Sequence, residues 1–333
     1  MLISKKVVSL CCQHPPSLFT MLKSAGRFFN FSMKVNYTHK CTLPQELIPL
    51  LKKRGLTITD EQKAINYLTN IGYFRLSAYC YPLLEAPKTN QHYKHGATFD
   101  LVMNMYRFDR KLRILLFNEI EKIEVAIRSA MSNWISDESG DIFWMTELKH
   151  FKNPALFEKR LAFIQSELEK SDEDFIIDFR NNYSNPYPPA WMIAEIASFG
   201  VLCSTFNNLK YKSIKKKVAS HFRLPVSVFA SWMVSLVNLR NLCGHHNRTW
   251  NRENPLIPAD LKTPAFAWIN SSTTDMKRIY YRICIIKYLL FTISPNNTFT
   301  QNLISLLEKY PTVDRRAMGF PDNWRLEPLW QEK

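Results

Sequence analysis

Residues 99–134 read FDLVMNMYRFDRKLRILLFNEIEKIEVAIRSAMSNW, and this stretch decides the fold class. Its apolar residues recur at three- and four-residue spacing, and opposite charges stand four residues apart at Asp109/Arg113 and Glu124/Arg128. Both patterns are typical of an α-helix, because residues three and four apart are neighbours on a helix surface. The spacing therefore predicts one long helix over residues 99–134, with the two charge pairs as structural ion pairs.

The composition agrees with a helical protein. Glycine counts only 8 of 333 residues, well below the usual share of roughly 7%, and glycine is the residue on which tight turns and phosphate-binding loops depend. The chain contains neither G-x-G-x-x-G nor G-x-x-x-x-G-K-[ST], which disfavours nucleotide-binding α/β enzymes of those types. We therefore predict an all-α fold with irregular connections.

The charge balance indicates a polyanionic partner. Lys and Arg number 44 against 29 Asp and Glu, a formal net charge of +15, which suits a nucleic acid or an anionic membrane surface. The longest apolar stretch, residues 283–293, contains Lys287 and is shorter than the roughly 20 residues of a membrane span. We expect a soluble protein without a membrane partner.

The seven cysteines are odd in number and form no C-x-x-C pair. This usage indicates reduced thiols in the cytoplasm, not a disulfide framework or a zinc module. We therefore expect a cytoplasmic protein that holds no structural metal.

Several boundaries follow from local signals. Residues 1–32 carry four basic residues and no acid, and Pro15-Pro16 breaks their apolar run. We interpret them as a non-native or disordered extension before a natural start at Met33, with one helical domain over residues 33–333. A helix is expected to end at Gly55, and the next to begin after Thr59 or Asp60. Residues 73–77 are expected to lead into an irregular stretch through Gly96, and further helices to lie within 153–181, from Trp191 and from near Pro225.

The last of these helices combines a core stripe with polar groups. In VSVFASWMVSLVNLRNLCGHHNRTWNR, residues 226–252, Arg240 falls on the same side as Phe229, Trp232 and Leu236 at 100° per residue. A buried unpaired charge costs several kcal/mol, so Arg240 must meet an acid, a subunit interface or a bound anion. Glu195 is one candidate partner, although a local structural bond elsewhere is the simpler role for Glu195.

Asn241, His245 and Arg248 share another face if the helix continues. Histidine transfers protons near neutral pH, an asparagine on its face can fix the ring, and arginines can hold a phosphodiester. These groups suffice for metal-independent RNA cleavage by 2′-hydroxyl attack. An R-x-x-x-x-H also occurs by chance, and Cys243, His245 and His246 together suggest a metal site but lack a companion ligand pair.

These residues resemble a known family. Arg240-Asn241-x-x-x-His245 resembles the R-N-x-x-x-H signature of the HEPN ribonuclease superfamily, and more closely that of the Abi-like (abortive infection) family of bacterial phage-resistance proteins. Four further blocks resemble the same family, in order YFRLSAYCYPL (73–83), YRFDRKLRILLFNEIEKIEVAIR (106–128), PPAWMIAEIASFG (188–200) and MGFPDNWRLEPLW (318–330). The family pattern often has Ala and Leu where this chain has Gly244 and Thr249.

The resemblance implies a HEPN-like helical bundle with additional N-terminal and C-terminal helical elements. It implies an endoribonuclease of an antiphage or toxin–antitoxin system, active as a homodimer whose two motifs form a composite site, and restrained in some cases by an RNA or protein antitoxin. Arg240 and His245 would be the catalytic pair and Asn241 the orienting residue. His246 and Arg248 would contact the substrate backbone, with no cofactor and no metal ion.

The basic run over residues 209–223 is a second candidate RNA contact. It contains Lys215, Lys216 and Lys217, which we assign to substrate binding, although such a run is often a solvated helix face. The alternative to an endoribonuclease is a non-catalytic RNA-binding or sensor protein on the same scaffold. A helical protein–protein adaptor is a third possibility that leaves the basic charge unexplained.

Overall fold

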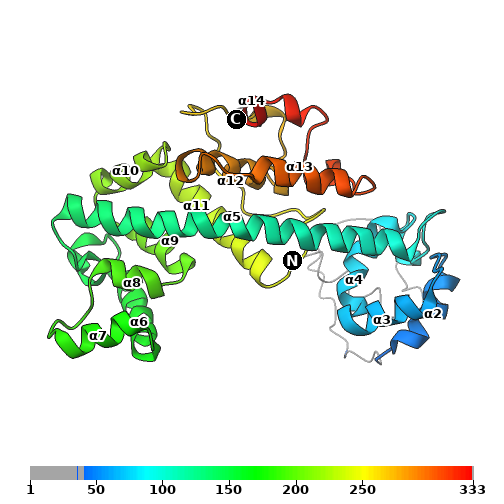
Figure 1. The fold of residues 1–333 in the computed structure, drawn as a ribbon, viewed down its shortest axis with the longest axis horizontal. Helices are drawn as coiled ribbons and strands as arrows, with labels where there is room; N and C mark the ends of the chain where they lie inside the picture. Colours follow the sequence, from blue (N-terminus) through cyan, green and yellow to red (C-terminus); the bar gives the residue numbers. More distant parts are fainter. Residues whose placement is uncertain (1–35, 37–40, 332–333) are drawn as a thin grey trace, which may run out of the picture. The chain divides into compact units, whose positions relative to one another are not determined.

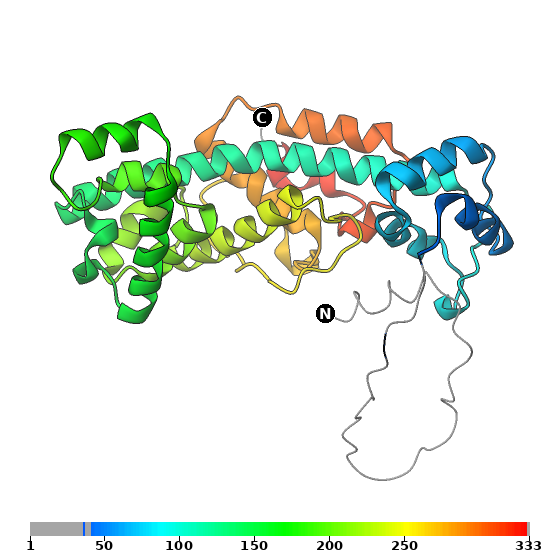
Figure 2. The ribbon, with the colours of Figure 1, turned by 90° about the horizontal axis from the view of Figure 1, so that it is seen from below.

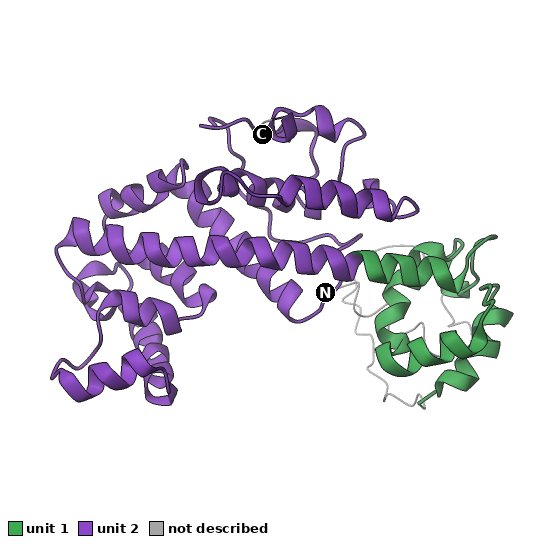
Figure 3. Cartoon of the chain, viewed as in Figure 1, with its two compact units in different colours: residues 1–108 green, residues 109–333 purple. Residues whose placement is uncertain are grey.

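The computed structural model describes residue 36 and residues 41–331, and that part of the chain contains 13 α-helices, labelled α2 to α14, and no β-strand (Figure 1). The predicted all-α fold is confirmed. The chain divides into two compact units, one ending at Phe108 and the other beginning at Asp109 (Figure 3). The boundary lies inside the long helix α5 (Phe99–Ser139), so the predicted helix is present and extends five residues beyond Trp134.

The first unit contains α2 (Pro44–Lys53), α3 (Glu61–Ile71), α4 (Tyr73–Cys80) and the start of α5. Both predicted helix signals are confirmed. Gly55 takes a φ of +90°, a conformation suited to glycine, and the following Leu56 N–H donates to the Leu51 carbonyl. The Asp60 carboxylate caps α3 by accepting from the Lys63 N–H at 2.9 Å, so Asp60 is the cap and Thr59 is not.

The irregular stretch that the sequence predicts after Ser77 begins later, because a helix covers the residues up to Cys80. Residues 73–80 form α4, whose buried residues include Tyr73, Leu76 and Tyr79, at three-residue spacing. Gly72, with a φ of +87°, ends α3, and α4 begins at the next residue, Tyr73. The helix therefore continues three residues beyond Ser77 before the irregular connection begins.

The second unit is built along α5. Core side chains of α5 recur on one face and are fully buried: Leu112, Leu116, Ile120, Ile123 and Ile127. The unit also contains α6 (Pro154–Lys170), α7 (Asp174–Asn182), α8 (Ala190–Ile196), α9 (Phe199–Asn208), α10 (Lys212–His221), α11 (Val226–Gly244), α12 (Ile279–Ile293), α13 (Phe299–Lys309) and α14 (Pro328–Gln331). Figure 1 shows α11 crossing α5 obliquely (Figure 2 gives the view from below), and α10 packs against α11.

The predicted core stripe of α11 is confirmed. Phe229, Trp232, Met233, Leu236 and Leu239 are each at most 1% exposed, and α11 packs against α9, α10 and α12. Among the described helices, α11 is the one whose 19 residues are long and apolar enough to cross a membrane. That is weak evidence for a span, because the core helix of a soluble protein meets the same criteria.

Candidate active site at the end of helix α11

Helix α11 ends inside the arginine–histidine motif. Gly244 is its last residue, and His245 follows with near-helical angles, its N–H donating to the Asn241 carbonyl at 3.0 Å. The next residue, His246, has a φ of +57°, and the Asn247 N–H donates to the Leu242 carbonyl at 2.9 Å. Asn241 and His245 therefore lie one helical turn apart, and both are exposed to solvent.

The predicted place of Arg248 is wrong. A helix that continued through Gly244 would place Arg248 on one face with Asn241 and His245. The positive φ of His246 turns the chain away from the helix axis, so Arg248 lies half-buried in the following loop. Glycine near a helix end is a common stop signal, and Gly244 is the last residue of α11.

A buried carboxylate on α5 holds the loop that follows the motif. Asp109 is fully buried and accepts hydrogen bonds from the Trp250 N–H at 2.8 Å, from the Thr249 N–H at 3.2 Å and from the Thr249 hydroxyl. It also pairs with Arg113 at 2.6 Å, which confirms the predicted ion pair. Because charge-assisted hydrogen bonds are the stronger class, Asp109 fixes where the chain goes after His246.

The partner of Arg240 is Glu124 and not Glu195. Arg240 Nε lies 3.6 Å from Glu124 Oε2, and its guanidinium carbon lies 5.9 Å from the centre of the Phe117 ring. The Arg240 side chain is 41% exposed, so it sits at the rim of the apolar stripe and not in its middle. Glu195 is exposed and lines the same cleft as Arg240.

Glu124 is also connected to the end of α8, through Arg128. Its second carboxylate oxygen accepts from Arg128, which confirms the predicted Glu124/Arg128 pair. Arg128 in turn donates to the carbonyls of Ala194 and Ala197, the second at 2.6 Å. Carbonyls at a helix end lack partners inside the helix, so Arg128 satisfies those that end α8. One carboxylate thereby connects α8, α5 and Arg240.

Arg240 stands at an open cleft of about 320 Å³. Its Nε is covered, while no described residue pairs with its two terminal nitrogens. The guanidinium therefore presents a charged edge with two donors, which is the shape that a phosphate or carboxylate binds. The cleft is lined by Phe117, Glu121, Glu124, Val125, Arg128, Glu195 and Arg240.

The three predicted substrate-binding lysines lie on α10, at the other end of α11. Lys215 is half-buried and donates to the Asn207 carbonyl at 2.9 Å, while the Lys217 ammonium lies 5.3 Å from the centre of the Trp134 ring. Lys216 is exposed. The Phe206 ring under Lys215 contacts Phe229 of α11, and Arg240 is 11 residues beyond Phe229, about 16 Å along the helix. The structure therefore separates the lysines from the motif.

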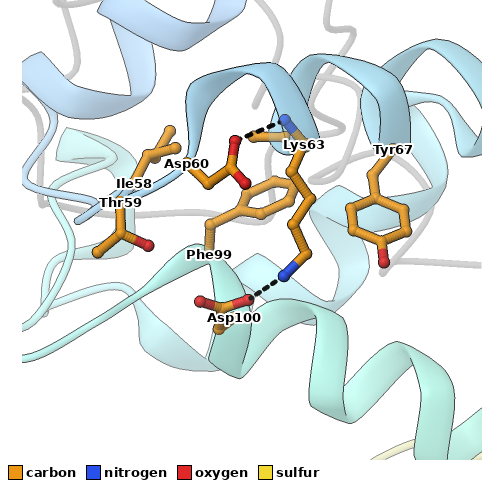
Figure 4. A pocket seen from close by; sticks show the side chains of 8 residues that line it. Ile58, Thr59, Asp60, Lys63, Tyr67, Phe99 and Asp100 are labelled. Atoms are coloured by element: carbon orange, nitrogen blue, oxygen red, sulfur yellow. Dashed lines mark hydrogen bonds and ion pairs between the residues drawn. The ribbon is translucent and has the colours of Figure 1, made fainter.

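A second cavity, in the first unit, carries no comparable chemistry. It has a volume of about 10 Å³, enough for roughly one water molecule, and lies beside Asp60, Lys63 and Asp100 (Figure 4). Asp60 is occupied as the α3 cap, and the Lys63 ammonium lies 3.9 Å from Asp100. In the part of the chain that the structure describes, no three His, Cys, Asp or Glu side chains are grouped to hold a metal ion.

The fold and the site together define a class of protein: an all-α chain that presents an Arg-Asn-x-x-x-His set where a helix ends beside an open cleft. The chain belongs to the Abi-like protein family, whose model matches residues 66–251, more than half of the chain. It is thus a member of the abortive infection class of antiviral defence proteins. No curated protein and no solved structure matches the chain.

Proposed function

We propose that this protein is a metal-independent, HEPN-type endoribonuclease of a bacterial antiphage or toxin–antitoxin system, acting in the cytoplasm. One observation carries the proposal. Arg240 lines an open cleft, its Nε lies 3.6 Å from Glu124 and its two terminal nitrogens have no partner among the described residues, at the helix end where His245 is exposed. An anion-binding edge and a proton-transfer group at the same helix end are the minimum that phosphodiester transfer requires.

The proposed reaction uses the 2′-hydroxyl of the RNA as nucleophile. His245 removes its proton, the 2′-oxygen bonds to the adjacent phosphorus, and the bond from phosphorus to the 5′-oxygen breaks. The leaving 5′-oxygen takes a proton from the second subunit's His245. Arg240 stabilises the charge that develops on the phosphoryl oxygens, and Asn241 orients the His245 ring. The products are a 2′,3′-cyclic phosphate and a 5′-hydroxyl. In this proposal, His246 and Arg248 contact flanking phosphates.

An exposed apolar face supports the homodimer. Ile114, Phe117 and Val125 of α5 are 56%, 38% and 53% exposed, and their spacing places them on one side of the helix. Large apolar side chains gathered on a surface mark interaction sites. Phe117 also contacts Arg240, so a second copy covering this face would lie beside the motif. We propose this face as the dimer interface that brings two motifs together.

The test measures cleavage of a labelled RNA and of its all-deoxy analogue, with and without EDTA. Wild type is expected to cut the RNA alone, EDTA to have no effect, and Arg240→Ala and His245→Ala to lose activity at equal folded amounts. Asn247→Ala, in the same exposed turn, is the matched control and should keep it. Cleavage that EDTA abolishes and Mg²⁺ restores, or equal cutting of the deoxy strand, would contradict the mechanism.

A second function has one observation in its favour. Three acids, Glu121, Glu124 and Glu195, line the cleft beside Arg240 and repel a polyanion. Such repulsion opposes the binding of a phosphodiester for cleavage in the cleft. A non-catalytic RNA-binding or sensor protein on the same scaffold would tolerate it. In the same assay that protein would bind RNA without cutting it. Under either function, an RNA or protein antitoxin would act by covering the cleft.

A further inference from the structure

A group of lysines at the start of α10 has no acidic partner. We name it the lysine platform. Among the described residues no Asp or Glu forms an ion pair with any of its five lysines. Lys152 precedes α6 and joins the others only through the fold, since it lies 58 positions before Lys210 in the chain. The platform consists of Lys152, Lys210, Tyr211, Lys212, Lys215 and Lys216.

The platform is rigid because two chain segments are bonded to each other beneath it. Phe151 and Leu209 form an isolated β-bridge, in which the Lys152 N–H donates to the Asn208 carbonyl at 3.0 Å and the Lys210 N–H donates to the His150 carbonyl at 2.8 Å. The Asn208 side chain, 2% exposed, adds two 3.1 Å bonds to the Asn153 main chain. Lys152 and Lys210 are thus held at fixed positions.

The lysines repel one another in the free protein. The pKa of Lys215 is lowered, first by its burial and second by the positive charge of Lys152. Lys149, by contrast, ion-pairs with Asp141 at 2.7 Å and marks the edge of the unpaired group. Like charges kept together without counter-charges favour a polyanion, which removes the repulsion when it binds.

An aromatic ring in the platform distinguishes between polyanions. Tyr211 is 45% exposed, and the Lys210 ammonium lies 5.4 Å from the centre of its ring. Lysines that follow a phosphate backbone, together with an open ring on which a base can stack, are the combination that binds single-stranded nucleic acid. We infer that the lysine platform is an RNA-binding surface separate from the cleft at Arg240.

The separation gives this surface a role in substrate choice, which rests on the proposed function. The Lys215 ammonium lies over the Phe206 ring, which contacts Phe229 of α11, and Arg240 lies 11 residues beyond Phe229, about 16 Å along the helix. At about 3.4 Å per stacked nucleotide, an RNA needs roughly five nucleotides to reach from one to the other. The platform would therefore favour long RNA over short fragments.

The experiment measures binding of a fluorescein-labelled 25-nucleotide single-stranded RNA to full-length protein over a salt series. All proteins carry His245→Ala, so the result does not depend on cleavage. The test variant adds Lys152→Gln, Lys210→Gln, Lys212→Gln and Lys216→Gln. The matched control removes the same charge from four exposed lysines outside the platform with Lys159→Gln, Lys170→Gln, Lys262→Gln and Lys309→Gln.

The test variant is expected to raise the Kd at least tenfold at about 0.1 M salt and to reduce the slope of log K against log salt by about 2.8, since each lost single-strand phosphate contact removes about 0.7. The control is expected to change the slope by less than one contact. Equal weakening by both variants would overturn the inference, as would no weakening by the test variant. Failure of the wild-type surface to bind RNA would also overturn it.

Two further arms complete the test. Tyr211→Ala should weaken RNA binding at unchanged salt slope, because stacking carries no charge, and an unchanged Kd would remove the ring from the inference. Binding to vesicles of anionic phosphatidylserine, lost in the test variant while RNA binding persists, would assign the platform to a membrane instead. In proteins with His245 intact, lysine loss should slow cleavage of the 25-nucleotide RNA and not of a four-nucleotide one.

Discussion

Replacing Asp109 by Asn removes the negative charge on which the loop after the motif depends. Asn keeps the shape and the acceptor at Oδ1, which Trp250 and Thr249 use, but it places an NH₂ group at Oδ2, where Asp109 accepts from Arg113 and from the Thr249 N–H. It also leaves Arg113, 5% exposed, without its counter-charge. Removing one partner of a buried pair costs about 3–5 kcal/mol. We expect the free energy of unfolding to fall by that amount, and the Tm by roughly 6–20 °C for a unit of this size.

Urea unfolding followed by tryptophan fluorescence measures the change. Asp100→Asn is the control, because Asp100 is 58% exposed and its contact with Lys63 is a surface pair, a kind that contributes about 0–1 kcal/mol. Thr249→Val removes one hydroxyl that donates to Asp109 and should cost about 1 kcal/mol. The three variants therefore separate the buried charge from a single hydrogen bond and from a general loss of charge.

Two results would refute this reasoning. A loss below about 1 kcal/mol in Asp109→Asn would show that the carboxylate does not anchor the loop. Adding Arg113→Met to Asp109→Asn should recover part of the stability, because the unpaired buried charge is then gone. A double variant no more stable than Asp109→Asn would show that the charge of Arg113 is not the cause.

The remaining predictions concern pH and thiols. Burial by itself would raise the pKa of Asp141, but hydrogen bonds from Lys149, His150 and the Phe143 main chain outweigh it and hold the pKa at about 2. Because the unfolded carboxyl titrates near 3.9, about 2 kcal/mol of stability is present above that pH and lost as pH falls toward 2. Asp141→Asn should flatten this acid limb in a urea series, and parallel curves would contradict it. With Cys11 and Cys12 replaced by Ser, a thiol reagent at pH 8 should label one native thiol, the exposed Cys41, and five after unfolding. The other four thiols are buried, which raises the pKa of Cys80 and of Cys243 to about 12, that of Cys203 to about 11 and that of Cys284 well above 9.0. Labelling of a second thiol in the native protein would refute this prediction.

Local patterns predicted the parts of the fold that depend on neighbouring residues. The α5 helix, the Asp60 cap and the apolar stripe of α11 each follow from spacing or from a single capping side chain. Asp109/Arg113 and Glu124/Arg128 were likewise visible, because four residues of helix place their side chains together. The extent of α4 is less predictable, because its eight residues give too short a pattern to show where the helix ends.

The arrangement around the motif depends on contacts that no spacing encodes. Glu124 and Arg240 are 116 residues apart, and nothing local distinguished Glu124 from Glu195 as the partner. Lys152 joins the α10 lysines through one bridge at Phe151 and Leu209. Sequence reasoning identified Arg240 as a charge that needs a partner. Which acid supplies it, and that Asp109 reaches the loop after His246, required the packed structure.

Helix α5 acts as a rigid rod that sets the spacing between the two carboxylates that position the motif. Asp109, which holds the loop, and Glu124, which holds Arg240, are 15 residues apart on it, about 22 Å in length and about 60° in rotation. No Gly or Pro interrupts residues 99–139, so the rod has no flexible position that could compensate for an inserted or deleted residue. One residue inserted between the two carboxylates would turn them about 100° further apart and lengthen the rod by about 1.5 Å. Natural variation in chain length should therefore fall in the loops of this family and spare the interval between Asp109 and Glu124.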